Sequence, residues 1–235
     1  MLTSLSQHRG QVGTGVPVRS APWADPFADD RAHRQGMSSL TLAPPRPVVR
    51  VGPVRTVANG VTLVRTVLAL ALGLVGVASG DLAVLAVAYA VYWVGDILDG
   101  WAARRLGQET RLGAVLDIVS DRACTSVLCA GLVTHVGGVV PVAVVFLLSF
   151  MVLDTMLSLA FLCWPLVSPN EFHLVDRQVW RLNWSPPAKA LNTAAVVLAV
   201  VLGLPGPALA IAAAVLGVKV LSAGRVLALL ERDAR

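Results

Sequence analysis

After residue 50, long apolar runs alternate with short polar connections along the chain. A helix needs ~20 apolar residues to cross a bilayer, and six runs approach or exceed that length. The predicted helices cover residues 59–79, 82–106, 112–133, 139–164, 189–204 and 207–230. Only helices and closed barrels satisfy the backbone inside lipid. We therefore expect an all-α polytopic membrane protein with about six transmembrane helices.

The connections between these runs contain residues typical of turns. Gly80-Asp81, residues 107–110, residues 135–138 and Pro205-Gly206 predict short turns. Residues 165–187 form the longest internal polar stretch and mix aromatic with basic residues. This mixture is typical of a segment at the membrane–water interface.

The first 48 residues have a different composition, rich in Gly, Pro, Ser, Arg and Asp, and contain no apolar run that predicts a signal peptide. We expect a disordered cytoplasmic tail over 1–48 and one transmembrane domain over 49–235. Residues 49–57 are basic and partly apolar, which predicts a short N-terminal helix lying in the interface.

Composition supports the membrane assignment, since 56% of the 235 residues are hydrophobic and 14% are charged. Soluble domains carry ~25% charged residues. The net charge of +5 does not indicate nucleic-acid binding, because the basic residues gather at the ends of the apolar runs. The connections near Gly80, Gly137 and Pro205 contain no Lys or Arg. The positive-inside rule therefore places both termini and the 107–111 connection on the cytoplasmic side of the cell membrane.

Four carboxylates interrupt the apolar pattern between the second and third predicted helices. Asp96 and Asp99 are three residues apart, and Asp117 and Asp121 are four apart, so each pair lies on one helix face. A charged side chain in a membrane helix costs at least ~2.5 kcal/mol and needs a partner. Carboxylate oxygens suit hard divalent cations, so the pattern predicts a Mg²⁺ or Mn²⁺ site. Polar residues lining a helix contact are the plainer alternative.

The spacing resembles the signature of the CDP-alcohol phosphotransferase family, D-x2-D-G-x2-A-R-x8-G-x3-D-x3-D. The sequence matches all eight fixed positions of that signature, which are Asp96, Asp99, Gly100, Ala103, Arg104, Gly113, Asp117 and Asp121. Thr110 stands six residues after Arg104, where the phosphatidylinositol-phosphate synthase branch also has a hydroxyl residue.

The resemblance implies a role for each matched residue. The first three aspartates, Asp96, Asp99 and Asp117, are expected to hold metal. Asp121 is expected to act as the catalytic base and also to touch a metal. Small residues suit the places where a flat cytosine or a diphosphate approaches the backbone, and Arg104 suits a phosphate. The expected substrate-binding residues on this stretch are Gly100, Ala103, Arg104, Thr110 and Gly113.

A second, weaker landmark opens the first predicted helix, where Asn59, Thr62 and Arg65 lie three residues apart. In the family this region helps to hold the nucleotide, so Asn59 and Thr62 are expected to bind substrate. The alternative is a helix cap at Asn59 followed by an Arg65 that reaches to the interface.

The acceptor side departs from the family. Members that use a phosphorylated acceptor usually carry Arg or Lys in the fourth helix, but residues 148–158 contain only Asp154 as a charged group. Asp154 is either a packing contact to another helix or a group that binds an acceptor hydroxyl or amine. Lys189, Lys219 and Arg225 remain candidates for an anion site.

We expect an enzyme that transfers a phosphatidyl group from CDP-diacylglycerol to a small alcohol and releases CMP, acting as a homodimer in membrane lipid. A sister reaction would transfer a CDP-linked polar alcohol to diacylglycerol. A cation or proton transporter is the alternative of another class. It predicts an internal repeat, which the sequence does not show.

Overall fold

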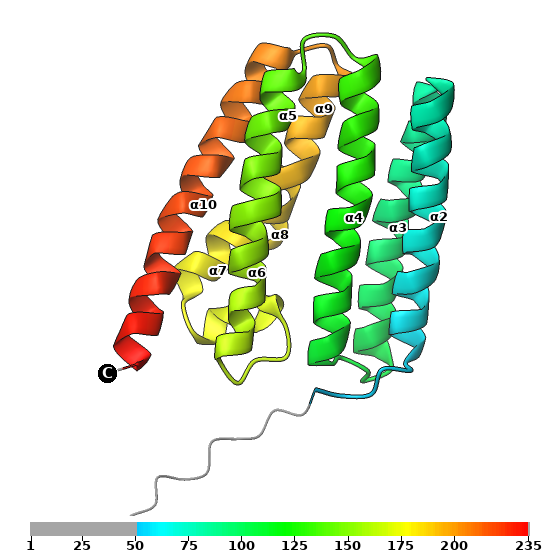
Figure 1. The fold of residues 1–235 in the computed structure, drawn as a ribbon. Coiled ribbons are helices and arrows are strands. Elements are labelled where there is room, and N and C mark those ends of the chain that lie inside the picture. The colour runs from blue at the N-terminus through cyan, green and yellow to red at the C-terminus, as the bar shows by residue number, and fades with distance from the viewer. Residues whose placement is uncertain (1–50, 235) are drawn as a thin grey trace, which may run out of the picture. The chain divides into compact units, whose positions relative to one another are not determined.

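The computed structural model describes residues 51–234, and these residues form helices without a strand (Figure 1). The predicted tail over 1–48 and the first two residues of the predicted interfacial helix lie outside the described residues. The all-α class expected from the sequence is confirmed.

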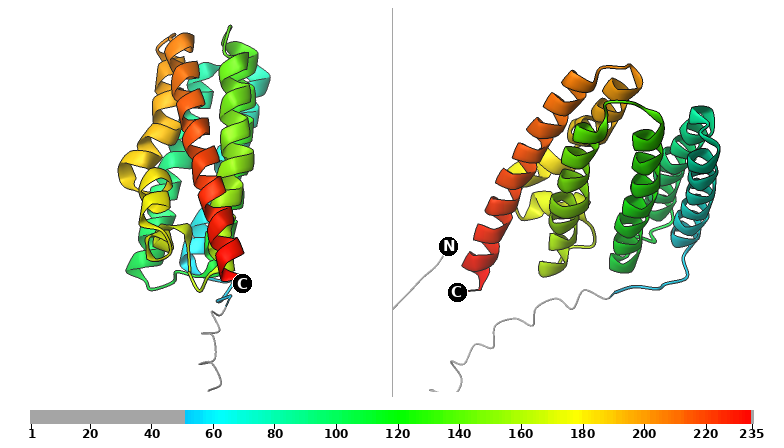
Figure 2. Two further views of the ribbon diagram at one scale, coloured as in Figure 1. Left: turned by 90° about the vertical axis from the view of Figure 1, so that its left-hand side faces the viewer. Right: turned by 45° about the horizontal axis from the view of Figure 1, so that its top comes forward.

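Three long helices pack together at one side of the domain. They are α2 (Val57–Ser79), α3 (Leu82–Arg105) and α4 (Arg111–His135). Each of them contacts the other two, and they stand side by side in Figure 1 and in the right-hand view of Figure 2. Small residues along the buried face of α2, among them Ala69, Gly73 and Gly76, let α3 and α4 approach closely.

The second group of helices begins with one continuous rod from Val140 to Cys163. It consists of α5 (Val140–Leu147), the π-helix η1 (Leu148–Asp154), α6 (Thr155–Leu159) and the 3₁₀-helix η2 (Ala160–Cys163). A second rod from Pro186 to Val201 consists of α8 (Pro186–Lys189), the π-helix η4 (Ala190–Ala194) and α9 (Ala195–Val201). The last helix, α10 (Pro205–Asp233), packs on both rods.

Four helical stretches are long and apolar enough to cross a membrane, namely Val57–Ser79, Leu82–Arg105, Val140–Cys163 and Pro205–Asp233. The predicted third span exists as α4, which has 25 residues but carries Asp117, Asp121 and Arg122 in its first half. The predicted fifth span is the shorter helix Pro186–Val201. The chain is therefore a multi-pass membrane protein with six helical rods at the predicted positions.

The polar stretch between the two rods, residues 164–185, forms two short helices rather than an irregular loop. It contains the 3₁₀-helix η3 (Pro169–Leu174) and α7 (Arg177–Asn183). Phe172 is fully buried and packs edge-on against Trp164. From α4, Arg111 donates hydrogen bonds to the carbonyl oxygens of Leu166 and Trp164. These contacts hold the stretch against the end of α4 that carries the aspartates.

Two expectations were wrong in detail. Residues 51–56 are not an interfacial helix, because Gly52 has φ +90° and the carbonyl of Val51 accepts a hydrogen bond from the Leu112 amide at 3.3 Å. This segment runs along the start of α4 and ends at Thr56, which caps α2. Pro205 and Gly206 were predicted to form a loop between helices, but they are the first two residues of α10. Proline is well suited to the first position of a helix.

The connections alternate between the two ends of the domain. The start of α2, the connection from α3 to α4 and the end of α10 lie at one end (Figure 1). The connections from α2 to α3, from α4 to α5 and from α9 to α10 lie at the other end (Figure 1). The basic connections predicted to share one side of the membrane therefore share one end of the fold.

Candidate active site

One face of α2 carries Asn59, Thr62 and Arg65, and all three side chains are buried. Their spacing of three residues places them on the side of the helix that packs on α3 and α4. The Arg65 side chain is buried between helices and does not extend to the membrane–water interface. The alternative interpretation of the sequence, in which Arg65 reaches that interface, is therefore wrong. The cap of α2 is Thr56, whose hydroxyl accepts a hydrogen bond from the Asn59 amide at 3.0 Å.

The Arg65 guanidinium binds all four motif carboxylates. Its Nε donates to Asp99 Oδ2 at 2.7 Å. Its Nη2 lies 2.5 Å from Asp117 Oδ1, 3.2 Å from Asp121 Oδ1 and 3.4 Å from Asp96 Oδ1. The arginine side chain is only 3% exposed. A single buried cation therefore sits at the centre of four anions.

Neighbouring residues fix this guanidinium from several sides. A Cβ at Gly95 would lie 2.5 Å from the Cβ of Arg65, so only glycine lets α3 pass so close to the arginine. Thr62 Oγ1 donates to Asp99 Oδ2 at 2.8 Å. The Arg65 Cζ atom lies 5.6 Å from the centre of the Tyr92 ring, within cation–π range.

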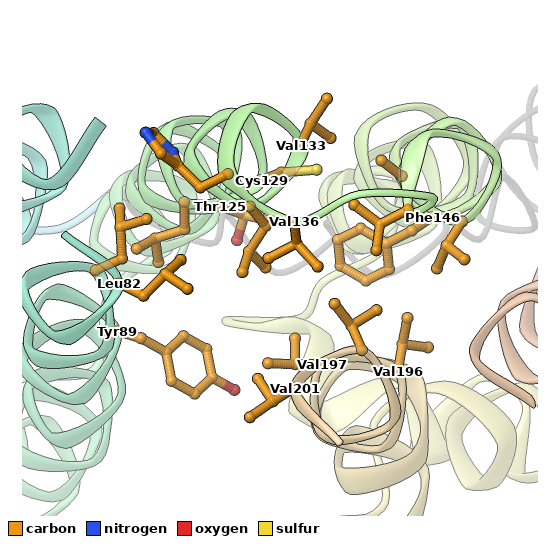
Figure 3. A pocket seen from close by; sticks show the side chains of 18 of the residues that line it. Leu82, Tyr89, Thr125, Cys129, Val133, Val136, Phe146, Val196, Val197 and Val201 are labelled. Carbon is orange, nitrogen blue, oxygen red and sulfur yellow. The ribbon is translucent and has the colours of Figure 1, made fainter. Parts of the chain in front are cut away.

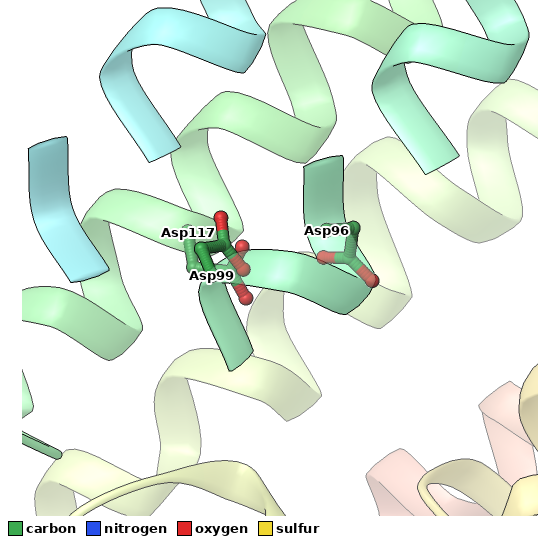
Figure 4. A group of neighbouring side chains, drawn as sticks. All are labelled: Asp96, Asp99 and Asp117. Atoms are coloured by element: carbon green, nitrogen blue, oxygen red, sulfur yellow. The ribbon is translucent and has the colours of Figure 1, made fainter. Parts of the chain in front are cut away.

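Three of the carboxylates form a group suited to a metal ion. Asp96, Asp99 and Asp117 each offer an oxygen, and these oxygens lie within 4.8 Å of one another. Figure 4 shows them projecting from α3 and α4. Asp99 is 6% exposed, whereas Asp96 and Asp117 are each 40% exposed. A purely oxygen donor set with accessible members fits Mg²⁺ or Mn²⁺.

Asp121 lies one turn beyond Asp117 on the same face of α4 and is 23% exposed. It does not belong to the group of three, but the same arginine nitrogen joins it to them.

All the predicted site residues line one cavity of about 720 Å³. The cavity lies between the first three helices and the second helix group, and it includes both the carboxylates and the loop that joins α3 to α4. The eleven predicted residues on its wall are Asn59, Thr62, Asp96, Asp99, Gly100, Ala103, Arg104, Thr110, Gly113, Asp117 and Asp121.

Some of these residues also hold the site together. Thr110 caps α4, and its hydroxyl accepts a hydrogen bond from the Gly113 amide at 2.9 Å. A Cβ at Gly113 would lie 2.9 Å from Asn59 Oδ1, so this glycine lets the start of α4 pack on α2. Asn59 Nδ2 in turn donates to the Val54 carbonyl at 2.8 Å. Arg104 is exposed, and a nitrogen of its guanidinium lies 3.3 Å from where a Cβ of Gly100 would be.

Comparison with known proteins agrees with this geometry. Residues 55–223 match the sequence model of the CDP-alcohol phosphatidyltransferase family. The chain belongs to the CDP-alcohol phosphatidyltransferase family. This confirms the resemblance read from the aspartate motif, and it identifies a transferase rather than a transporter.

Two fungal relatives resemble parts of this CDP-alcohol phosphatidyltransferase. A CDP-diacylglycerol–inositol 3-phosphatidyltransferase of Schizosaccharomyces pombe is 61% identical over 33 residues, which cover 14% of each chain. The protein of the same name from Candida albicans is 47% identical over 51 residues, which cover 22% of this chain and 20% of the relative. The similarity thus spans about a fifth or less of either relative. No solved structure matches the chain.

The wall of the cavity also carries a charged cluster that sequence reasoning only half identified. Asp154 pairs with Arg122 of α4, with Nη2 to Oδ2 at 2.6 Å, and with Lys219 of α10. The sequence singled out Asp154 and Lys219 but not Arg122, which directly follows Asp121. Arg225 was a candidate for the same anion site, but it pairs with Asp176 at 2.8 Å and does not line the cavity.

A second cavity of about 570 Å³ adjoins the first and is mostly apolar. Its wall comes from α3, α4, α5 and α9, and Figure 3 shows Leu82, Val133, Val196 and Val197 around it. Tyr92, Phe146 and Thr193 line both cavities. The charged cavity and the apolar cavity therefore lie next to each other and share three wall residues.

We predict that Arg65→Gln destabilises the protein most strongly when divalent cations are removed. Losing one partner of a buried ion pair costs about 3–5 kcal/mol, because the other charge stays buried without compensation. A bound cation supplies part of the missing charge. Thermal unfolding in detergent, with EDTA and with excess Mg²⁺, measures the effect.

The matched control is Arg225→Gln, which removes an arginine whose side chain is 50% exposed. It should lower the melting temperature slightly and equally in both conditions. Equal losses for the two variants in EDTA would contradict the central role of Arg65.

Proposed function

We propose that this protein transfers a phosphatidyl group from CDP-diacylglycerol to a small alcohol and releases CMP. The observation that carries the proposal is the convergence of the four motif carboxylates on one arginine at the wall of a large cavity. Family membership agrees with this chemistry. The names of the two fungal relatives specify the same donor, with inositol as acceptor.

Asp96, Asp99 and Asp117 would hold a divalent cation, and Asp121, which the Arg65 guanidinium joins to them, is proposed as a further ligand. Such a cation, when bound, neutralises charge on the diphosphate and on the departing CMP. Arg104 and the small residues Gly100, Ala103 and Gly113 line the part of the cavity nearest the α3–α4 connection. We assign the nucleotide to this part, together with Asn59, Thr62 and Thr110.

Asp121 is the proposed base. The acceptor oxygen attacks the phosphorus that bears diacylglycerol, and its proton passes to the Asp121 carboxylate. The bond from that phosphorus to the bridging oxygen breaks, and CMP leaves with that oxygen. Asp121 suits this role because it lines the cavity, is 23% exposed and lies outside the group of three carboxylates that would hold the metal.

The apolar cavity is the proposed place for an acyl chain of the lipid substrate. Tyr92, Phe146 and Thr193 line both this cavity and the charged one. We propose that the polar head of the lipid lies in the charged cavity and its tail in the apolar one. The basic connections lie at one end of the fold, which supports an active site on the cytoplasmic side of the cell membrane. A homodimer stays a prediction.

We expect CMP release to require CDP-diacylglycerol, an alcohol and a divalent cation. The purified protein in mixed micelles is assayed for CMP and for lipid product, with Mg²⁺, with Mn²⁺ and after exhaustive EDTA treatment. Full turnover without divalent cations would contradict the metal assignment. Product formed only from a CDP-linked polar alcohol and diacylglycerol would favour the sister reaction.

We predict that Asp121→Asn keeps donor binding but lowers the transfer rate at least ~10²-fold, the low end of a general-base contribution. Asparagine preserves the shape of the side chain but does not accept the proton. Donor affinity and single-turnover rate are measured on one preparation. Lost binding with an unchanged rate per bound donor would instead make Asp121 a structural ligand.

We predict that Val197→Trp raises the KM for long-chain CDP-diacylglycerol by about tenfold or more and spares a short-chain donor. Val197 lines the apolar cavity (Figure 3), and excluding each methylene group costs about 0.8 kcal/mol. Leu198→Trp is the matched control, since Leu198 is the next residue of α9 and is 58% exposed. Equal effects of the two variants would argue against an acyl chain in this cavity.

A further inference from the structure

The connection from α3 to α4 also reaches the start of α2, through the side chain of Gln108. Its Oε1 atom accepts a hydrogen bond from the Val57 amide at 2.9 Å and a longer one from the Ala58 amide at 3.5 Å. The start of α2 and this connection lie at the same end of the fold (Figure 1). One side chain therefore links the end of α3 to the beginning of α2.

Gln108 supplies acceptors that α2 itself does not contain. The first four amides of an α-helix have no acceptor within the helix. In α2, the amide of Thr56 donates to a carbonyl two residues earlier, and the Thr56 hydroxyl accepts from the Asn59 amide. The amides of Val57 and Ala58 are the other two, and Gln108 accepts from both. The first turn of α2 thus depends on an oxygen from another part of the chain.

The backbone around Gln108 is fixed by the end of α3. The Gln108 amide donates to the Ala103 carbonyl at 2.8 Å, and the Gly107 amide donates to the Arg104 carbonyl at 3.4 Å. Gly107 has φ +61°. This pair of bonds around a left-handed glycine is the Schellman motif, which ends many helices. The backbone of Gln108 is therefore tied to the last turn of α3 while its side chain holds α2.

The segment before α2 packs on the same connection. The Val51 carbonyl accepts a hydrogen bond from the Leu112 amide at 3.3 Å. A Cβ at Gly52 would lie 2.5 Å from Thr110 Cγ2, so the two backbones approach closely there. The start of α2 and the α3–α4 connection therefore form one closely packed junction, to which Gln108 contributes hydrogen bonds.

This junction lies beside the proposed nucleotide site. Arg104 belongs to the last turn of α3 and Asn59 to the first turn of α2, and both are proposed to bind the nucleotide. Gln108 and Ala58 line the same cavity as these two residues. Because Gln108 connects the two turns, its hydrogen bonds set the distance between the two sides of the nucleotide site. Its side-chain oxygen is already engaged by two amides, which favours a positioning role over direct binding through that atom.

We propose that Gln108 is a positioning residue for the donor CDP-diacylglycerol. Its Oε1 atom holds the first turn of α2 against the last turn of α3, at the separation that the nucleotide of the donor requires. The side chain takes no part in the transfer step. This inference rests on the proposed function and adds to it a residue that acts on donor binding through the backbone of α2.

Two variants separate the oxygen of Gln108 from its other properties. Gln108→Met keeps a side chain of similar length but offers only a weak acceptor. We expect it to raise both the Kd and the KM for CDP-diacylglycerol by at least about fivefold, because two amides lose their acceptor. The kcat should stay within about twofold of wild type, since the lost interaction is the same in the ground state and the transition state.

Gln108→Glu keeps an acceptor oxygen, and a negative charge is favourable at the start of a helix. We expect it to bind the donor at least about threefold more tightly than Gln108→Met. The purified proteins in mixed micelles are titrated with CDP-diacylglycerol in the presence of Mg²⁺. High salt screens the repulsion between the added charge and the anionic donor. CMP release from the same preparations gives KM and kcat.

Gln178→Met is the matched control. Gln178 Oε1 also accepts a hydrogen bond, from Arg225 Nη1 at 2.7 Å, but it lies on the surface of α7 and outside the cavity. This variant should leave Kd, KM and kcat for the donor unchanged. Neither Kd nor KM depends on the fraction of protein that is folded. Should Gln108→Met not fold, Gln108→Asn replaces it, because its oxygen is one methylene group short of the two amides.

The outcomes separate this proposal from the proposed function. Unchanged donor affinity in Gln108→Met, or a lower kcat with unchanged affinity, overturns the positioning role while CMP release still supports the transferase. Equal losses in Gln108→Met and Gln108→Glu also overturn it, because they point to a substrate contact through the amide nitrogen. If the wild-type protein binds the donor but releases no CMP, the proposed function fails and the order of the Kd values still decides the role of Gln108. A wild-type protein that does not bind CDP-diacylglycerol overturns both.

Discussion

The structure of the active site depends on one ion cluster, in which the Arg65 guanidinium binds four carboxylates. Four like charges within a helix bundle repel one another, and a membrane-spanning helix tolerates a charge only when it has a partner. Arg65 meets this constraint from a third helix, so α2, α3 and α4 are tied together at the level of the aspartates. The same ion pairs therefore hold the three helices together and position the carboxylates of the site.

This cluster requires the helices to approach closely. Gly95 lets α3 pass the stem of Arg65, and Gly113 lets α4 pass Asn59. Further from the charges, the buried face of α2 continues with Ala69, Gly73 and Gly76. Interfaces between membrane helices gain their stability from close packing and hydrogen bonds rather than from a hydrophobic driving force. The small residues therefore serve both the stability of the bundle and the position of the carboxylates.

The first three helices and the second helix group leave two adjoining cavities that differ in character. One is lined by the carboxylates and by the cluster around Asp154, and the other is lined mostly by apolar residues of α3, α4, α5 and α9. Tyr92, Phe146 and Thr193 lie where they meet. A reaction between a soluble alcohol and a lipid needs such an arrangement, because the reacting groups are polar while the substrate tail stays in an apolar environment.

The sequence alone determined the helical class, the positions of the six helical rods and the residues of the carboxylate motif. These features are local, since they follow from apolar runs and from the spacing of residues on one helix face. All eleven site residues expected from the sequence line one cavity, while their individual roles stay predictions. Sequence reasoning failed at residues 51–56 and at Pro205, where a glycine with positive φ and the preference of proline for the first turn decide the local structure.

Only the tertiary structure decided which charges meet. Arg65 lies 31 residues before Asp96 and 56 before Asp121, and Asp154 meets Lys219 across 65 residues. No periodicity in the sequence reports such pairings, because they depend on which helix faces pack together. The π-helical segments η1 and η4 also change which residues of their rods face the neighbouring helices, and the sequence did not predict them. The spacing of residues identified the four aspartates, and the packing of the helices determined that Arg65 is their partner.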